Sequence, residues 1–191
     1  MDIIGRRTLR DLLHEKTEMY RDKTFLLFED REQRLYQQTY GEFFEQVGRL
    51  SRLFHDYGVG KGDHVALHLP NCLEFMVCWF ALANIGAIMV PTNPLNTSEE
   101  MEYILQHSES VLLITEESYL EKFLGIRERL PRLKDILLSR YDGDEYRGQS
   151  LSRLMAGADS WVPDVRLASE DVAAMLYTSG TTSRPKGVQI T

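Results

Sequence analysis

The hydrophobic positions of the chain repeat with two different periods, which together predict alternating helices and strands. Apolar side chains at helical spacing follow Thr39, at Phe43, Phe44, Val47, Leu50 and Phe54. Short apolar runs of the kind that form buried strands lie elsewhere, at 25–28, 65–69, 88–90, 111–115 and 136–139. Strands that alternate with helices are typical of a parallel sheet with helices on both faces. The sequence therefore predicts an α/β fold with parallel-rich sheets flanked by helices.

Helix boundaries are predicted from capping boxes, in which a polar N-cap residue is followed three positions later by Glu. The pattern occurs three times, at Thr39 with Glu42, Asn71 with Glu74, and Thr97 with Glu100. Glycine favours helix ends, and the first two helices are expected to stop at Gly58 and Gly86. We expect helices from Thr39 to near Gly58 and over 72–84, 97–107, 118–130 and 151–156. Segments 141–148 and 160–169 are expected to be surface connectors.

The segment 75–97 contains no charged residue and is long enough to cross a membrane. Asn84, Gly86 and Pro91 interrupt it, and no cluster of Lys or Arg flanks it. We therefore expect a buried helix followed by a buried strand, with no transmembrane segment. Within this segment, an apolar stripe at helical spacing is formed by Phe75, Met76, Trp79, Phe80 and Ala83. The stripe could line an acyl pocket or belong to the hydrophobic core, and we favour the core.

Composition narrows the class of protein but does not identify it. The 191 residues are 43% hydrophobic and 27% charged, which is ordinary for a globular protein. The net charge of −7 argues against nucleic acid as a partner. Cys72 and Cys78 do not form a CxxC pair, so free thiols in a reducing cytoplasm are expected. The N-terminus has an acid at Asp2 and no apolar core of a signal peptide, which also favours a cytoplasmic location.

Pairs of residues that suggest metal or second phosphate sites are better explained otherwise. His64 and His68 are four apart, but their surroundings alternate as in a strand, where that spacing spans about 13 Å. Acidic residues within 141–148 lack the spacing of a calcium site. The sequence Gly-Lys-Gly-Asp at 60–63 fits a tight turn into the strand that follows.

The strongest chemical signal is a loop-like segment rich in Gly, Ser and Thr near the C-terminus. It reads Tyr-Thr-Ser-Gly-Thr-Thr-Ser-Arg-Pro-Lys-Gly-Val over 177–188 and follows an apolar run at 172–177, which predicts a buried strand. Glycine lets backbone N–H groups approach a phosphate, hydroxyls donate hydrogen bonds, and Lys186 adds positive charge. The alternative is a flexible linker. An ordered Pro-Lys-Gly directly after an apolar run favours the phosphate loop.

The segment is not the loop of a P-loop NTPase. That pattern needs Gly, four residues, and then Gly-Lys followed by Ser or Thr. Counted from Gly180, this chain has Pro185 in place of the second Gly and Gly187 in place of the hydroxyl residue. A different family of phosphate loops is therefore required.

The segment resembles the signature loop of the acyl-adenylate-forming (AMP-binding) superfamily, which reads Thr-Ser-Gly-Thr-Thr-Gly-x-Pro-Lys-Gly. Ser183 stands where that loop has Gly, which removes freedom at positive φ and adds a hydrogen-bond donor. Segments 58–66 and 85–94 are similar to two further motifs, Gly-x-x-x-Gly-Asp-x-Val-Ala and Gly-Ala-x-x-x-Pro-x-Asn-Pro. Within the acyl-CoA synthetase branch, the likeness is to the carnitine and crotonobetaine CoA ligases.

The resemblance implies a fold, a reaction and a set of binding residues. Residues 1–191 are expected to form the N-terminal part of the large AMP-binding domain, cut shortly after the phosphate loop. The implied reaction joins a small carboxylic acid to AMP from ATP, with Mg²⁺, and passes the acyl group to CoA. The residues implied to bind ATP are Thr178, Ser179, Gly180, Thr181, Thr182, Ser183, Arg184, Pro185, Lys186 and Gly187.

Other readings of the same resemblance remain open. The family's catalytic and metal-binding residues are expected beyond Thr191, so this chain alone is predicted to be inactive. The acid is carnitine, crotonobetaine or a short or medium-chain fatty acid. Alternatively, the chain is a truncated binding module without catalysis, or part of an adenylation domain that does not use CoA. The sequence gives no indication of the oligomeric state.

Overall fold

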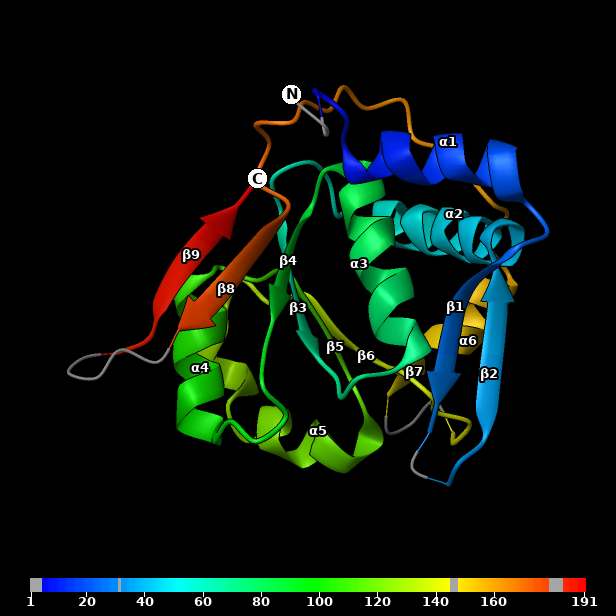
Figure 1. Cartoon of the computed structure of the whole chain (residues 1–191). Helices are drawn as coiled ribbons and strands as arrows, with labels where there is room; N and C mark the ends of the chain where they lie inside the picture. Colours follow the sequence, from blue (N-terminus) through cyan, green and yellow to red (C-terminus); the bar gives the residue numbers. More distant parts are fainter. Residues whose placement is uncertain (1–4, 31, 145–147, 179–183) are drawn as a thin grey trace.

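The computed structural model describes residues 5–30, 32–144, 148–178 and 184–191. Its centre is a seven-stranded sheet of strand order β7-β6-β5-β3-β4-β8-β9 (Figure 1). All neighbouring strands in it run parallel except β8 and β9, which form an antiparallel hairpin. The strands of this sheet are β3 (His64–His68), β4 (Ile88–Pro91), β5 (Leu112–Thr115), β6 (Asp135–Leu138), β7 (Gln149–Ser150), β8 (Ala174–Thr178) and β9 (Lys186–Ile190). The parallel-rich α/β fold that the sequence predicts is therefore confirmed.

Helices cover both faces of the sheet and divide the core into two clusters. The first cluster lies between the sheet and α1 (Leu9–Tyr20), α2 (Tyr40–Asp56), α3 (Leu73–Ile85) and α6 (Leu151–Ala156). The second lies under α4 (Ser98–His107), α5 (Glu117–Leu124) and a 3₁₀ turn at Arg127–Arg129. Because side chains alternate along a strand, Val65 and Leu67 of β3 enter the first cluster and Ala66 enters the second.

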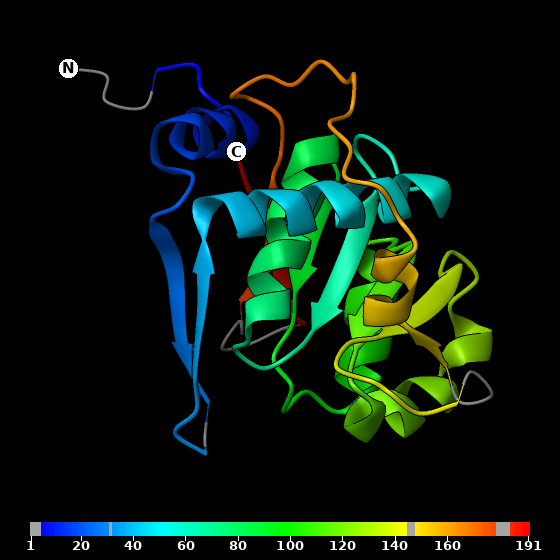
Figure 2. The same cartoon turned by 90° about the vertical axis from the view of Figure 1, so that its right-hand side faces the viewer.

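A separate antiparallel ribbon is formed by β1 (Thr24–Glu29) and β2 (Leu35–Thr39). Figure 2 shows this ribbon standing apart from the main sheet. Phe25 anchors it, with ring centroids 4.8 Å from Phe43 of α2 and 6.2 Å from Phe80 of α3. The apolar run at 25–28 predicts the first strand but not its position outside the main sheet.

Two of the three predicted capping boxes are confirmed, and one is wrong. The side chains of Thr39 and Thr97 accept from the backbone N–H three residues on, and the carboxylates of Glu42 and Glu100 accept from the backbone N–H of Thr39 and Thr97. Asn71 does not cap α3, because the helix begins one residue later with Cys72 as its N-cap. Glu74 is then the second helical residue and is not placed to complete a box.

Two further boundaries differ from the prediction. The helix expected over 118–130 ends at Leu124, because Gly125 is the C-cap and a 3₁₀ turn follows it. Tyr141, expected in a surface connector, is buried at 4% exposure and donates its hydroxyl to the carbonyl of Asp144. The remainder of that connector, 145–147, lies outside the described residues.

The apolar segment 75–97 forms α3 and then β4, as predicted. Phe75, Met76, Trp79 and Phe80 pack against the first core cluster, so the apolar stripe is mainly core. In the part of the chain that the structure describes, helices lack the combination of length and hydrophobicity needed to span a membrane.

Gly86 ends α3 in a backbone conformation that other residues adopt at a cost. Its φ is +75°, and an added Cβ would lie 2.7 Å from Leu167 Cδ2. We expect Gly86→Ala to lower the free energy of unfolding by about 1–2 kcal/mol. Denaturant titration would measure this. The control is Gly157→Ala at the end of α6, where φ is −88° and the nearest atom to the new Cβ is 3.8 Å away. Equal losses in both variants would contradict the prediction.

Candidate functional site

The predicted phosphate loop connects the two strands of the β8–β9 hairpin. Tyr177 pairs with Gly187 and Thr178 pairs with Lys186, so the strands are in register up to the loop. Of the ten predicted binding residues, Thr178 and 184–187 are described, whereas 179–183 lie outside the described residues. The strand before the loop spans Ala174–Thr178 rather than 172–177 and is only partly buried, because Leu176 is 41% exposed.

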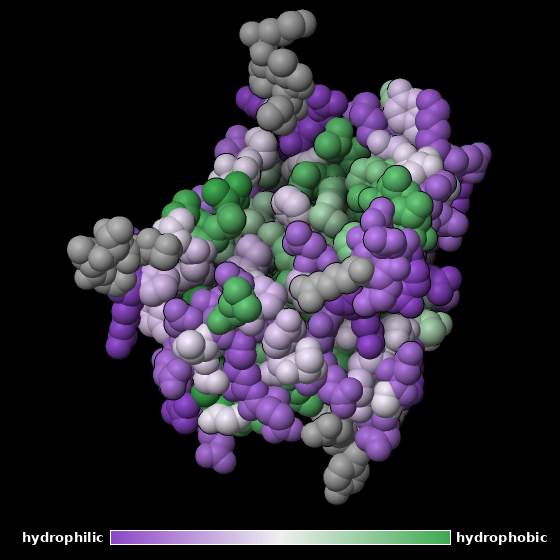
Figure 3. Space-filling model, turned by 60° about the horizontal axis from the view of Figure 1, so that its bottom comes forward, coloured by the Kyte–Doolittle hydropathy of each residue, from purple (hydrophilic) through white to green (hydrophobic). Residues whose placement is uncertain are grey.

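The sheet places the loop end of the hairpin at an edge suited to ligands. Since β8 runs parallel to β4, the carboxyl end of β8 lies on the same side of the sheet as the carboxyl ends of the other parallel strands. Ligands of open α/β sheets bind at this edge. Figure 3, in which the bottom of Figure 1 is turned forward, shows hydrophobic residues gathered in the upper part of the view and hydrophilic residues over most of the rest.

The described ends of the loop carry two exposed cations and one closely packed glycine. Arg184 and Lys186 are both exposed. A Cβ on Gly187 would lie 2.9 Å from Met175 Sδ, so the Met175 side chain would have to shift to admit a larger residue there. Lys186 and Arg184 can therefore offset anionic charge, and Gly187 packs closely against Met175.

Side chains of α4 hold both ends of the loop. The hydroxyl of Tyr103 donates to the carbonyl oxygen of Pro185 at 2.9 Å, and the Arg184 guanidinium lies 5.3 Å from the centre of the Tyr103 ring. His107 Nδ1 is 2.7 Å from the hydroxyl of Tyr177. Burial, with a smaller contribution from Tyr103, raises the pKa of Tyr177 to about 12. Tyr103 and His107 are not among the residues predicted from the sequence, although their spacing of four on a predicted helix places them on one face.

A hydrogen-bonded chain of side chains lies at the carboxyl ends of β3 and β4. His68, fully buried, has Nδ1 2.8 Å from Thr92 Oγ1, and Thr92 Oγ1 donates to the carbonyl of Leu67 at 3.2 Å. Lys122 Nζ lies 3.3 Å from His68 Nε2 and also donates to the carbonyls of Pro94 and Asn96. This arrangement assigns the imidazole proton to Nδ1, with Nε2 as acceptor.

The surroundings of His68 determine its protonation state. Burial, and secondly the positive charge of Lys122, lower the pKa of His68 to about 4, so the ring is neutral at pH 7. His64 and His68 lie at the two ends of strand β3, and the prediction that they belong to a strand rather than a helix is confirmed. Within the described ranges, no group of three or more His, Cys, Asp and Glu side chains is placed to hold a metal.

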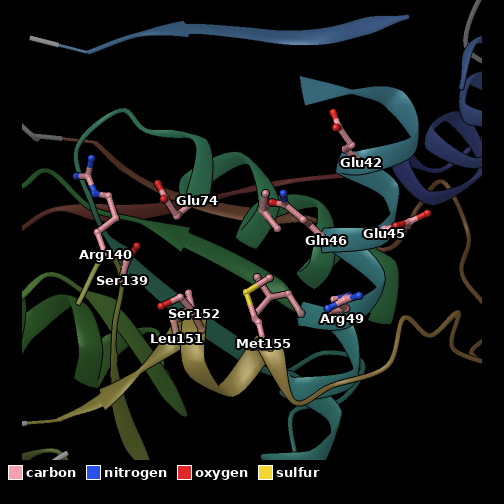
Figure 4. A pocket seen from close by; sticks show the side chains of 13 residues that line it. Glu42, Glu45, Gln46, Arg49, Glu74, Ser139, Arg140, Leu151, Ser152 and Met155 are labelled. Atoms are coloured by element: carbon pink, nitrogen blue, oxygen red, sulfur yellow. The ribbon is translucent and has the colours of Figure 1, made fainter. Parts of the chain in front are cut away.

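A cavity of about 480 Å³ opens elsewhere, between α2, α3, α6 and the end of β6 (Figure 4). Its floor is apolar, with Leu151 and Met155, and its walls carry both carboxylates and guanidinium groups. The carboxylates of Glu42, Glu45 and Glu74 outnumber the guanidinium groups of Arg49 and Arg140, so the lining has no excess of positive charge for a polyphosphate. In the sheet, β5, β3 and β4 separate β6 from β8. The hairpin, not this cavity, is therefore the candidate phosphate site.

Comparison with known proteins identifies the family of the chain. The family model described as AMP-binding enzyme matches residues 13–191. The chain belongs to this family. Crotonobetaine/carnitine–CoA ligase of Salmonella paratyphi A is 44% identical over 196 residues, and the protein of the same name from Salmonella typhimurium is 42% identical over 197. Both alignments cover the whole chain but only 38% of the relative, so this AMP-binding chain spans less than half the length of the curated relatives it matches.

Solved structures of the family superpose on most of the chain. The anthranilate CoA ligase AuaEII, in complex with anthranoyl-AMP, has a TM-score of 0.87 and 25% identity. The fatty acyl CoA synthetase of Mycobacterium tuberculosis has a TM-score of 0.82 and 25% identity. Each match covers 96% of this chain and 34% of the other. The AMP-binding chain thus has the fold of the N-terminal region of adenylate-forming enzymes.

Proposed function

We propose that the whole protein is an ATP-dependent acyl-CoA ligase and that residues 1–191 are the N-terminal part of its large AMP-binding domain. The observation that carries the proposal is the position of the signature loop. Its described ends, with the exposed cations Arg184 and Lys186, lie at the carboxyl edge of the parallel sheet. The names of the Salmonella relatives support CoA as the acceptor and a small carboxylic acid, such as carnitine or crotonobetaine, as the substrate.

The proposed reaction poses an electrostatic problem that this site suits. A carboxylate must attack the α-phosphate of ATP, which is a polyanion, and negative charge builds up on the departing pyrophosphate. Positioned cations and hydrogen-bond donors stabilise such charge where it develops. Lys186 and Arg184 would offset the charge of the β- and γ-phosphates, and the hydroxyl of Thr178 would donate a hydrogen bond. Mg²⁺, which prefers oxygen ligands, would be held mainly by the phosphates and would neutralise part of their charge.

Two other features are consistent with a cytoplasmic ligase. Cys72 and Cys78 are free and buried, and burial raises the pKa of Cys72 to about 12, so neither thiol is a reactive nucleophile. Free thiols are the usual state in a reducing compartment. Nucleic acid is an unsuitable partner for a chain with a net charge of −7.

Product analysis of the whole protein tests the proposal. With ATP, Mg²⁺ and CoA, we expect the thiol to be consumed and AMP and pyrophosphate to be released when carnitine, crotonobetaine or a short fatty acid is supplied. Formation of AMP that never requires CoA would identify an adenylation enzyme instead. ADP as the product, or no reaction with any acid, would overturn the proposal.

The 191-residue chain by itself is expected to be inactive. It spans 38% of the length of its relatives, and the reaction needs groups held together in one geometry. The measurement is carboxylate-dependent exchange of labelled pyrophosphate into ATP, with the whole protein as the positive control. Exchange by the 191-residue chain above the background without acid would contradict the expectation.

A further inference from the structure

Among the described residues, strand pairing joins the β8–β9 hairpin to β4 only at the end away from the loop. The backbone N–H of Met89 donates to the carbonyl of Ala173 at 3.1 Å, and Met89 pairs with Ala174. In a parallel ladder, the next N–H that faces β8 belongs to the residue two positions on, which is Pro91. Proline has no N–H, so the ladder between β4 and β8 stops there. The end of the hairpin that carries the loop therefore needs another support.

Helix α4 supplies that support through two residues one turn apart. Tyr103 holds the β9 side of the loop, through its hydroxyl to Pro185 and its ring under Arg184. His107 holds the β8 side, through its contact with the hydroxyl of Tyr177. The two rings also contact each other, with centroids 5.5 Å apart. We call Tyr103 and His107 the α4 clamp. Figure 1 shows the loop end of the hairpin beside α4.

Helix α4 is held in place by its N-terminal cap and by its packing in the core, so the α4 clamp occupies a defined position beside the loop. Thr97 and Glu100 form a complete capping box at its start. Met101, Ile104 and Leu105 are each at most 2% exposed in the second core cluster. A displacement of the hairpin would break contacts to a rigid element rather than carry that element along with it.

We propose that Tyr103 and His107 are positioning residues for the phosphate-binding loop. The inference rests on the proposed function and extends it to a helix outside the signature sequence. The clamp orients Arg184 and Pro185 on one side and Tyr177 on the other, so that the cations at the loop ends meet the phosphates in one geometry. Misplacing a catalytic group by about 1 Å can reduce a rate about a hundredfold.

The test uses the whole protein and variants that remove the clamp in steps. Tyr103→Phe removes only the hydroxyl bound to Pro185 and keeps the ring under Arg184. We expect kcat/KM for ATP to fall about three- to tenfold, with most of the loss in kcat, because orientation matters most where charge develops. Tyr103→Ala, which removes the ring as well, is expected to lose more, about ten- to fiftyfold. His107→Phe, which loses the contact with the Tyr177 hydroxyl, should resemble Tyr103→Phe.

A matched control separates positioning from a general loss of stability. Tyr36→Phe also removes one tyrosine hydroxyl hydrogen bond, to Asp30 Oδ2 at 3.1 Å, on the β1–β2 ribbon. It should leave kcat and KM unchanged. Melting temperatures are measured for every variant. A merely structural clamp would lower the melting temperature of Tyr103→Phe without changing its kcat, and that result would overturn the inference.

Failure of the inference and failure of the proposed function give different results. Lys186→Ala is measured in the same assay. If Lys186→Ala reduces kcat and the clamp variants do not, the loop binds phosphate but α4 does not position it. If Lys186→Ala leaves kcat unchanged, the assignment of the loop is wrong and the proposed function loses its main support.

Discussion

Replacing Lys186 with alanine is expected to lower kcat/KM of the whole protein for ATP about ten- to a hundredfold. One positive charge beside a departing pyrophosphate stabilises the transition state by about 1–3 kcal/mol, which corresponds to such a factor in rate. Lys186 is exposed at the start of β9, and its removal leaves the core untouched. The free energy of unfolding should therefore change by about 0.5 kcal/mol or less. Steady-state kinetics and a melting curve on the same sample measure both effects.

Two controls make the Lys186 result specific. Ser183→Gly restores the residue that is usual in the family and should be nearly neutral. Lys23→Ala removes an exposed lysine just before β1 and should leave the kinetics unchanged. A flexible linker in place of the phosphate loop would make Lys186→Ala silent as well. A large drop in melting temperature for Lys186→Ala would show that the loop is structural rather than catalytic.

Acidification from pH 6.5 to pH 4 is expected to lower the free energy of unfolding by about 2–3 kcal/mol through His68. The unfolded chain takes up a proton on this residue near pH 6.5, whereas in the folded protein burial and Lys122 lower its pKa to about 4. Between these two pKa values the unfolded state binds more protons than the folded state. The free energy of unfolding therefore decreases as the pH falls, and it is restored when the pH rises above about 6.5. Urea titrations at several pH values measure the slope.

Variants of His68, His64 and Lys122 show which residue causes the pH dependence of the free energy of unfolding. His68→Gln keeps a hydrogen-bond acceptor for Lys122 but does not titrate in this range, so the slope should become clearly shallower. Burial also lowers the pKa of His64, and His64→Gln should remove a smaller part of the slope. Lys122→Met should raise the pKa of His68 and make the slope shallower too. An unchanged slope in His68→Gln would mean that other groups cause the loss.

The elements that local sequence rules specify were predictable. Capping boxes at Thr39 and Thr97 fixed the starts of α2 and α4, and glycine at position 86 fixed the end of α3. Hydrophobic runs located β3, β4, β5 and β6, because strands buried on both faces are apolar throughout. The box at Asn71 was wrong because α3 begins at Leu73, which makes Glu74 the second helical residue rather than the third.

The sequence did not predict the elements whose local signals are weak or the contacts between residues far apart in the chain. Helix α1 has its own capping box, Thr8 with Asp11, but Asp replaces the Glu of the usual pattern and the helix carries few apolar residues. The ribbon strand β2 is largely exposed and lacks a clear hydrophobic pattern. The motif at 177–188 indicated phosphate chemistry, but nothing in it indicated the ring contacts from α4, which join residues about 70 to 82 positions apart.

The position of β9 has a practical consequence for work on this chain. It is the last strand of the sheet, so the backbone N–H and C=O groups on its outer side have no neighbouring strand among the described residues. Val188 and Ile190 are each 45% exposed on it. Such an edge can pair with the same edge of another molecule. Solutions of the isolated 191 residues are therefore best studied at low protein concentration, with light scattering beside each measurement to detect growing particles.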